Sequence, residues 1–498
     1  MSIWIDLLYL LPWIALGVVA GALVGAVPGL TGAMVIALTV PLTFAMPQDA
    51  ALALLVSLYT GSVGGGLITA TLLKIPGTPA SMITILDAYP MTQRGESRKA
   101  LRLGIIASCC GGLISGIALL FLARPMAEWS VKLSAFDLFA LVLMALCFIA
   151  AVAEPGPRGL IRGLLSGTLG CLATLPGTHP ATGEVRYTGG FADLDGGLSL
   201  LPVLIGLFAF GQAFRDCLER IQGTSQPERT DEPTRADEKS ESPTVWKKLY
   251  GSILRSSFIG TIIGILPGIG ANVGSTVSYG VARQLSKEPE KFGNGSEEGL
   301  VASESANNAT VGGALIPLVS LGIPGSVVDA ILLGAFVIHG LQPGPLLFAN
   351  HPETVNSLIG AYFISNIVLV IVMLALSRSF VRVAQIPKAY LGPIILLLCI
   401  VGSYCLNNRL FDVSTMIVFG MIGLLFSKWK IPPAPFVIGF VLTPILEENL
   451  GAALMISGGS YAPLFTSPFA LICLLLSAVL IAGSYRQSLP SKAKHFSG

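Results

Sequence analysis

The sequence has little charge for its length. Only 12% of its 498 residues are Asp, Glu, Lys or Arg, whereas 53% are hydrophobic. Runs of about 20 apolar residues, long enough to span a bilayer, recur along the chain, which excludes a soluble protein. The runs lack the alternation of membrane β-strands, and backbone groups cannot stay unpaired in lipid. We therefore expect an all-α polytopic membrane protein with about 10 to 14 membrane segments.

Several functional motifs are also missing. The eight cysteines are scattered without a Cys-x-x-Cys pair, which argues against a disulfide framework or a metal site. The net charge is only +2, and no basic cluster with interleaved aromatic residues suggests nucleic acid. No GxxxxGK[ST] loop for binding ATP is present. The apolar N-terminal run has no Lys or Arg before it, so we expect a retained segment rather than a signal peptide.

The chain is organised around a duplicated pattern. Residues 64–81, GGGLITATLLKIPGTPAS, align without a gap with residues 312–329, GGALIPLVSLGIPGSVVD. A second pair of Pro-Gly interruptions lies upstream at 28–29 and 267–268, each after glycines spaced by four. Two halves, each with two interruptions of an apolar helix, are typical of a secondary transporter.

One segment divides the chain. Residues 215–248 are charged and rich in Pro, Ser and Thr, so they cannot form a packed core. We expect a first transmembrane half at 1–214, a cytoplasmic linker at 215–248, a second half at 249–485 and a basic tail at 486–498. The cytoplasmic placement follows from the Lys and Arg residues next to the adjoining membrane segments.

Loop charges predict how the halves are related. The loop at 94–102 is basic, whereas its counterpart at 339–353 has no Lys or Arg. Conversely, the loop at 41–50 lacks basic residues, and its counterpart contains Arg283, Lys287 and Lys291. Because basic loops stay in the cytoplasm, this exchange favours inverted repeats, related by an axis in the membrane plane.

The interruptions predict a binding site. Helix N-termini freed by a break favour carboxylates, and unwound carbonyls suit a small cation. We expect the breaks at 28–32, 76–81, 267–272 and 324–326 to converge near the bilayer midplane. The predicted substrate-binding residues are Gly29, Thr31, Gly32, Thr60, Ser62, Gly77, Thr78, Ser81, Asn308, Gly325 and Ser326. The predicted cation-binding residues are Pro267, Gly268, Gly270, Asn272, Ser303 and Asn307.

Simpler explanations compete for some of these features. Glycines spaced by four are often helix-packing faces, which alone can explain the run from Gly17 to Gly29. Lys74 could be a counter-charge for an anion or could extend to an interface. Glu304 could bind or relay a cation, or cap a helix, and Asp329 could be a ligand or a charge at a helix start. Recurrence of the breaks in register favours a functional site there.

Four segments carry a family resemblance: VPGLTGAMVIALTVPLTF, GGGLITATLLKIPGTPAS, SESANNATVGGALIPLVSLGIPGS and GAFVIHGLQPGPLLF. They resemble the TctA family, the large membrane subunit of the tripartite tricarboxylate transporters. The motif positions that match are Pro28, Gly29, Gly32, Pro76, Gly77, Pro267, Gly268, Asn307, Asn308, Pro324 and Gly325. Ser303-Glu304-Ser305-Ala306 departs from the more usual Pro-Glu-Ala-Ala.

The resemblance implies a multi-pass protein of the bacterial inner membrane. It implies uptake of citrate or a related dicarboxylate by symport with Na⁺ or H⁺, without a bound cofactor or a resident metal. The implied partners are a small TctB-like membrane subunit and a TctC-like periplasmic solute-binding protein. An intramembrane lipid-processing enzyme and a passive anion channel are the alternatives. The enzyme is disfavoured because no acidic pair, metal spacing or nucleophile with its base is evident.

Overall fold

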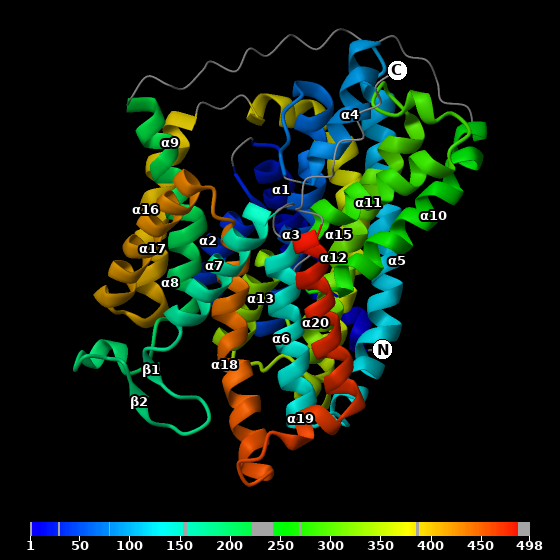
Figure 1. The fold of residues 1–498 in the computed structure, drawn as a ribbon. Helices are drawn as coiled ribbons and strands as arrows, with labels where there is room; N and C mark the ends of the chain where they lie inside the picture. The colour runs from blue at the N-terminus through cyan, green and yellow to red at the C-terminus, as the bar shows by residue number, and fades with distance from the viewer. Residues whose placement is uncertain are drawn as a thin grey trace, which may run out of the picture.

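The computed structural model describes residues 2–27, 30–78, 80–152, 157–221, 243–267, 270–384 and 388–486. These residues are almost entirely helical, which confirms the predicted fold class. Six described helical segments are long and apolar enough to cross a membrane: Leu7–Gly25, Gln48–Leu73, Ser97–Ser130, Pro352–Ala375, Leu410–Trp429 and Pro433–Ile456. Two short strands, β1 (Gly177–Thr178) and β2 (Val185–Arg186), pair antiparallel with Gly177 opposite Arg186. Figure 1 shows most of the helices lying side by side, with their axes running roughly from the top to the bottom of the view.

The first half opens with two broken helices. They are α1 (Ser2–Gly25) followed by α2 (Gly32–Thr43), and α3 (Gln48–Leu73) followed by α4 (Ser81–Gln93). After them come α5 (Ser97–Ser130), α6 (Ala135–Val152) and α7 (Pro157–Ala173). The 3₁₀ turn η1 (Ala192–Leu194), α8 (Leu200–Leu204), the π-helix η2 (Ile205–Phe210) and α9 (Gly211–Ile221) complete this half.

The second half repeats the order of elements. Its broken helices are α10 (Pro243–Ile265) with α11 (Gly270–Leu285), and α12 (Glu297–Leu321) with α13 (Val327–Ile338). The 3₁₀ turn η3 (Pro289–Lys291) joins the two pairs. The chain continues through α14 (Pro345–Asn350), α15 (Pro352–Ala384), α16 (Lys388–Asn407), α17 (Leu410–Trp429), α18 (Pro433–Ile456), α19 (Ala462–Thr466) and α20 (Pro468–Arg486).

Local chemistry explains the breaks at 74–80 and 322–326. Helices α3 and α12 end on left-handed residues, Lys74 with φ 57° and Gly322 with φ 69°. A proline follows each, and its ring cannot continue a helix. Glycine adopts this conformation without strain, whereas a lysine there costs about 1 kcal/mol. The next helix α13 starts at Ser326, whose Oγ accepts a hydrogen bond from the Asp329 backbone N–H at 3.3 Å.

The glycines spaced by four pack helices. A Cβ added to Gly17, Gly21 or Gly25 would lie well inside van der Waals contact with the α3 backbone. Gly260 and Gly264 meet the α12 backbone in the same way. The packing explanation therefore accounts for these positions, since only glycine lets the backbones approach so closely.

Cross-contacts give the helix directions. Thr60 contacts Ser365 and Gly64 contacts Leu369, so α3 and α15 run parallel. Gly111 lies against Ser305, and Ser115 lies against Gly312. The residue numbers again rise together, so α5 and α12 also run parallel.

Helices α5 and α15, by contrast, run in opposite directions. Gly112 of α5 lies against Asn366 of α15, whereas Gly116, further along α5, lies against the earlier residue Phe363. Because α3 runs parallel to α15, and α12 runs parallel to α5, the equivalent helices α3 and α12 are antiparallel. The predicted inversion of the two halves is confirmed.

The two halves meet at opposite ends of the molecule. At one junction the Asp87 carboxylate accepts hydrogen bonds from the backbone N–H groups of Gly293, Gly295 and Ser296, at 2.8 to 2.9 Å. At the other junction, Gln48 Nε2 donates to the His339 carbonyl at 2.9 Å. We use the names inner junction for the first and outer junction for the second.

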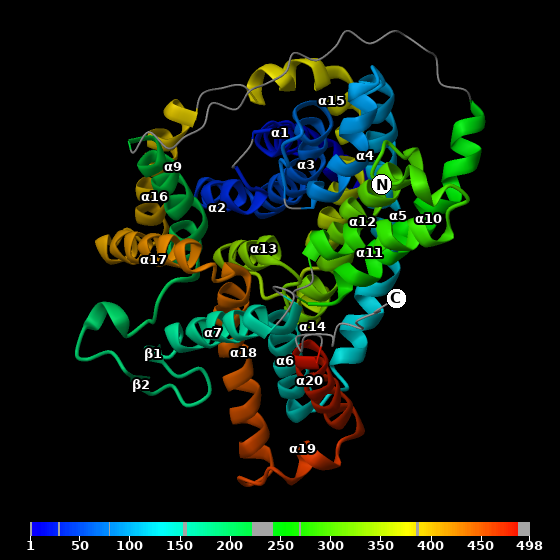
Figure 2. The same ribbon diagram turned by 45° about the horizontal axis from the view of Figure 1, so that its top comes forward.

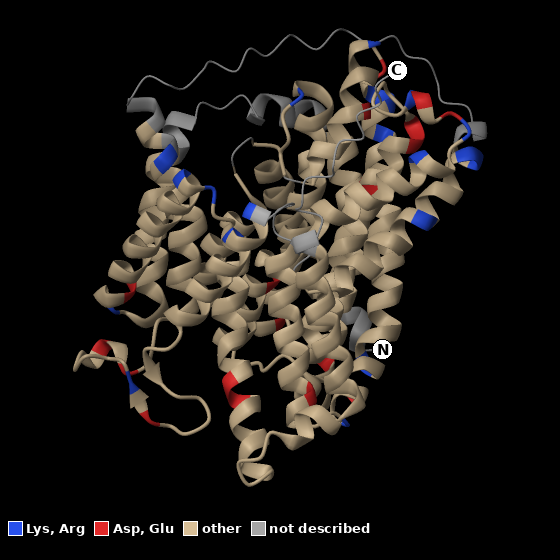
Figure 3. Cartoon of the chain, viewed as in Figure 1, with Lys and Arg blue, Asp and Glu red and all other residues tan. Residues whose placement is uncertain are grey.

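Charge is distributed unevenly between the ends. Figure 3 shows Lys and Arg gathered at the end that holds α4 and the last turns of α9, whereas acidic residues predominate at the opposite end. The inner junction lies at the basic end, beside Arg94, which hydrogen-bonds the Asn294 carbonyl. By the rule that basic loops stay inside, we expect this end to face the cytoplasm.

In Figure 2, α6, α7, α18 and α20 form a group beside the broken helices of the two halves.

Candidate functional site

In the first half, the two breaks meet at the middle of α3. A Cβ on Gly77 would collide with the Gly25 carbonyl and lie 2.7 Å from Gly66 Cα. Gly66 itself faces the hydroxyls of Thr78 and Ser81, which lie 2.6 Å from one another. These contacts place the second break, the end of α1 and the centre of α3 together.

The start of α2 joins the same cluster. A Cβ on Gly32 would collide with Ser62 Oγ of α3. The preceding residue, Thr31, accepts a hydrogen bond from the Met34 backbone N–H at 3.2 Å and so caps α2. The predicted substrate residues Gly32, Ser62, Gly77, Thr78 and Ser81 are thus gathered around α3.

The second half builds a matching cluster around α12. A Cβ on Gly325 would lie 3.2 Å from the Gly264 carbonyl and 3.2 Å from Ala314 Cβ. A Cβ on Gly274, in the first turns of α11, would lie 2.6 Å from Thr310 Oγ1 of α12. The ends of α10 and α12 and the start of α11 therefore come together as their counterparts do.

The clusters are linked by polar contacts between the halves. Tyr59 OH of α3 lies 3.4 Å from Ser326 Oγ at the fourth break. Thr84 of α4 donates to Glu304 Oε1 of α12 at 2.5 Å. Ser303 Oγ lies 3.4 Å from the same Thr84 hydroxyl.

Helix α15 adds two amide and hydroxyl contacts. Asn308 Nδ2 donates to Asn366 Oδ1 at 2.6 Å and to the Ser108 carbonyl at 2.9 Å. Ser365 Oγ donates to Thr60 Oγ1 at 3.2 Å. The predicted residues Thr60 and Asn308 are thereby held at equivalent places in the two halves.

Buried polar atoms without partners concentrate in the second half. Both amide atoms of Asn307, Glu304 Oε2 and both carboxylate oxygens of Asp329 have no hydrogen-bond partner, although each residue is at most 1% exposed. Native proteins leave few buried polar atoms unpaired. In a membrane span such groups are candidates for an ion or solute pathway.

The duplicated sequence relates these residues to one another. When the alignment of 64–81 with 312–329 is extended, Asn307 matches Tyr59 and Ser326 matches Thr78. Because Tyr59 contacts Ser326, the inverted symmetry predicts that Asn307 faces Thr78. The unpartnered amide then lies toward the first-half cluster. This arrangement favours one shared site.

Some predicted residues lie elsewhere. Gly29 and Gly268 fall outside the described residues, so their placement stays a prediction. Asn272 is exposed on α11, and Pro267 and Gly270 are half-buried beside the third break. Lys74 is also exposed, with its Nζ 5.4 Å from the Tyr89 ring centroid. The counter-charge role considered for Lys74 receives no support from this position.

Sequence reasoning missed three contributors, Tyr59, Thr84 and Asn366. The first two lie within a turn of the predicted residues Thr60 and Ser81, so the helical period could have suggested them. Asn366 lies in the long apolar helix α15, where an isolated amide is itself a signal. No group of three or more His, Cys, Asp or Glu among the described residues could hold a metal ion.

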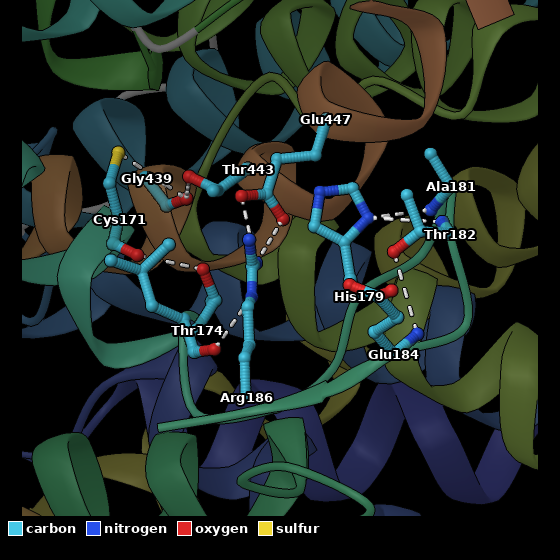
Figure 4. Close-up of polar contacts among 11 residues, drawn as sticks. Cys171, Thr174, His179, Ala181, Thr182, Glu184, Arg186, Gly439, Thr443 and Glu447 are labelled. Atoms are coloured by element: carbon cyan, nitrogen blue, oxygen red, sulfur yellow. Dashed lines mark hydrogen bonds and ion pairs between the residues drawn. The ribbon is translucent and has the colours of Figure 1, made fainter. Parts of the chain in front are cut away.

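A separate polar cluster lies at the outer end. Arg186 of β2 binds Glu447 of α18 through two hydrogen bonds of 2.8 and 2.6 Å (Figure 4). His179 Nδ1 accepts from the backbone N–H groups of Ala181 and Thr182 in the same hairpin. Glu447 lies inside α18. Here it holds the hairpin against the helix.

Comparison with known proteins gives a consistent result. The family model described as tripartite tricarboxylate transporter TctA family matches residues 11–438. An uncharacterized 52.8 kDa protein of Agrobacterium vitis, in the TAR-I ttuC' 3' region, is 34% identical over 472 residues, covering 94% of this chain and 92% of that protein. Another uncharacterized protein of that organism, in the TAR-II ttuC' 3' region, is 40% identical over 233 residues, or 47% of this chain and 96% of its own. No solved structure matches the chain.

Proposed function

This chain belongs to the tripartite tricarboxylate transporter TctA family, and we propose that it carries an organic carboxylate inward, driven by an ion gradient. The substrate is a tricarboxylate such as citrate or a related dicarboxylate. The chain acts as the transport subunit of a three-part system in the bacterial inner membrane. Its partners are a small TctB-like membrane subunit and a TctC-like periplasmic binding protein that delivers the substrate.

The observation that carries this proposal is the meeting of helix breaks around buried polar groups. In the first half, the breaks at 26–31 and 74–80 touch at the centre of α3. In the second half, unpartnered Asn307, Glu304 and Asp329 lie on α12 and α13. Broken helices around a midplane cluster are the usual form of a secondary transporter site.

The first half provides the better anion site. Thr78 and Ser81 lie at the start of α4, where the positive end of the helix dipole favours a carboxylate. The first half contributes no carboxyl group of its own at the positions equivalent to Asp329 and Glu304, which are Ser81 and Val56. A substrate carboxylate here meets the hydroxyls and backbone N–H groups of the first half.

The second half provides the better cation site. This half contributes two fully buried carboxyl groups, Glu304 of α12 and Asp329 of α13. Oxygen ligands of this kind suit Na⁺, and a carboxylate can also accept a proton. A cation bound here offsets the charge of the substrate and couples its movement to the gradient.

Transport measurements test the proposal. The complete chain is reconstituted in liposomes with its small subunit and binding protein, and uptake of labelled citrate and of several dicarboxylates is followed. The Na⁺ and pH gradients are varied one at a time. We expect saturable accumulation against the substrate gradient when one ion gradient is imposed.

Two results contradict the proposal. Uptake that only equilibrates the substrate indicates a passive channel. Absence of transport for all tested carboxylates, with the complex assembled and correctly inserted, contradicts the substrate class. The variant Glu128→Gln removes the ion pair between Arg124 and Glu128, whose side chains are both exposed, and so serves as the surface control.

A further inference from the structure

The Glu304 carboxyl group is a fully buried acid at the contact between α4 and α12. Thr84 Oγ1 is its only side-chain partner among the described residues, at 2.5 Å from Oε1. The second oxygen, Oε2, has no partner. An ionised carboxylate with one hydroxyl donor is costly in an apolar span, so this group needs either a proton or a bound cation.

Other ionisable groups on the packed elements do not supply that charge. Arg255 of α10 pairs with Glu298, and Lys99 of α5 pairs with Glu297. Those two acids lie in the first turn of α12, six or more residues from Glu304, which is ~9 Å along the helix. The cations Arg98 and Arg102 of α5, Lys247 and Lys248 of α10, and Arg283 of α11 are exposed, whereas Glu304 is fully buried. The buried and half-buried ionisable groups on these elements include Asp87 of α4 and Tyr279 of α11, both beside Gly299, with Cys109 of α5, Tyr59 of α3 and Asp329 of α13. None of these carries positive charge.

The hydroxyls around Glu304 fit a proton. Ser303 Oγ donates to the Leu300 carbonyl at 2.9 Å, so it has only acceptor capacity left for Thr84. Thr84 Oγ1 can therefore donate to Ser303 Oγ, 3.4 Å away, while it accepts from a protonated Glu304. It can instead donate to the ionised carboxylate. One hydroxyl rotation thus serves both protonation states.

We propose that Glu304 binds the coupling proton, with Thr84 exchanging its hydrogen bond between Ser303 and Glu304 as the proton arrives and leaves. The proton is taken from outside water, adds to a carboxylate oxygen and is released to the cytoplasm, so charge and atoms balance without another reactant. The site lies where α4 of one half crosses α12 of the other, which allows relative movement of the halves to open it to either side. The inference rests on the proposed function.

Net uptake and exchange distinguish the roles of this residue. With an inward pH gradient and no Na⁺ gradient, we expect Glu304→Gln to lower citrate uptake more than about tenfold, because the amide cannot release a proton. Exchange of internal for external citrate needs no net proton movement, so we expect it to persist. A pH-sensitive dye inside the liposomes should report proton entry with substrate for the wild type and none for Glu304→Gln.

Further variants make the result specific to Glu304. Thr84→Ser keeps the hydroxyl and should keep pH-driven uptake of citrate. Thr84→Val removes the hydroxyl and should shift the pH dependence of that uptake. Asp329→Asn removes the other buried acid of the proposed cation site and tests whether proton entry depends on that group instead. Glu128→Gln, on the exposed end of α5, should match the wild type.

Several outcomes overturn the inference. Unchanged proton entry in Glu304→Gln would show that Glu304 does not bind the coupling proton. Loss of proton entry in Asp329→Asn but not in Glu304→Gln would assign that role to Asp329 instead. Wild-type uptake driven by Na⁺ alone, without proton entry, assigns a different ion. Failure of wild-type exchange with every carboxylate instead contradicts the proposed function itself.

Discussion

The two halves of the molecule carry the same helix breaks but different side chains at equivalent positions of α3 and α12 and of α4 and α13. The first half has Val56, Tyr59 and Ser81 at the positions where the second half has Glu304, Asn307 and Asp329. The repeated backbone gives the two sets equivalent positions, whereas the two acids among them belong to the second half. The comparison teaches that inversion supplies the geometry and that divergence between the halves supplies two different ligand preferences.

The comparison depends first on the inversion of the two halves. The side of the membrane from which an engineered cysteine can be labelled tests that inversion with an all-or-none result. Positions 94 and 346 lie in equivalent loops that we expect on opposite sides of the membrane. In a variant without native cysteines, Arg94→Cys should react with an impermeant maleimide only from the cytoplasmic side. Leu346→Cys, at an exposed residue, should react only from outside. Labelling of both from one side contradicts the inverted arrangement.

The two Pro-Gly breaks should differ in their tolerance of a methyl group. A Cβ on Gly77 collides with the Gly25 carbonyl, whereas one on Gly325 keeps 3.2 Å from its nearest neighbours. We expect Gly77→Ala to lower the initial uptake rate more than about tenfold and Gly325→Ala to lower it only about two- to threefold, since overpacking costs about 1–3 kcal/mol. Uptake in proteoliposomes, normalised to inserted protein, measures the ratio. Equal losses would mean that the halves pack alike here.

The equivalent polar contacts of α15 should differ in stability. Asn308→Ala leaves Asn366 Oδ1 without its partner in a buried site, and we expect a loss of about 1–3 kcal/mol. Thr60→Ala removes a single hydroxyl contact with Ser365, for about 0.5–1.5 kcal/mol. Thermal unfolding of the two variants in detergent measures how much stability each one has lost. A larger effect for Thr60→Ala would reverse the assignment.

The outer junction should show the smallest effect, through pH. Burial lowers the pKa of His339, which lies in the loop after α13 with its Nε2 3.2 Å from Thr43 Oγ1. A lowered pKa means that the folded protein binds fewer protons than the unfolded chain, so stability falls as the pH drops below about 6.5. We expect a small fall in melting temperature that His339→Gln removes. An unchanged pH dependence in that variant would separate His339 from the junction.

Much of the fold was predictable because its signals are local. Ile-Pro-Gly at two equivalent positions predicted the breaks after α3 and α12, and the exchange of basic loops predicted the inversion. The cross-half contacts, such as Tyr59 with Ser326 and Thr84 with Glu304, were not predicted. Helical periodicity shows which residues share a face, but the neighbour of that face depends on how the two halves pack.

The predicted site residues divide for the same reason. Residues of the breaks themselves, including Gly77 and Ser81, gather as expected because the chain reversal fixes their position. Asn272 is exposed instead, since its place depends on which face α11 turns toward α12. The boundaries proposed for the two halves, the linker and the tail stay predictions, with the linker largely outside the described residues.

The antiparallel course of α3 and α12 has a consequence for the transport cycle. If each half took up the conformation now held by the other, the same chain would form a second structure with its openings interchanged. That second structure keeps the same chain connections, and the closeness of the contacts at the inner and outer junctions is exchanged. Exchange of the conformations of the two halves would therefore give the opposite end of the cycle from the arrangement described above.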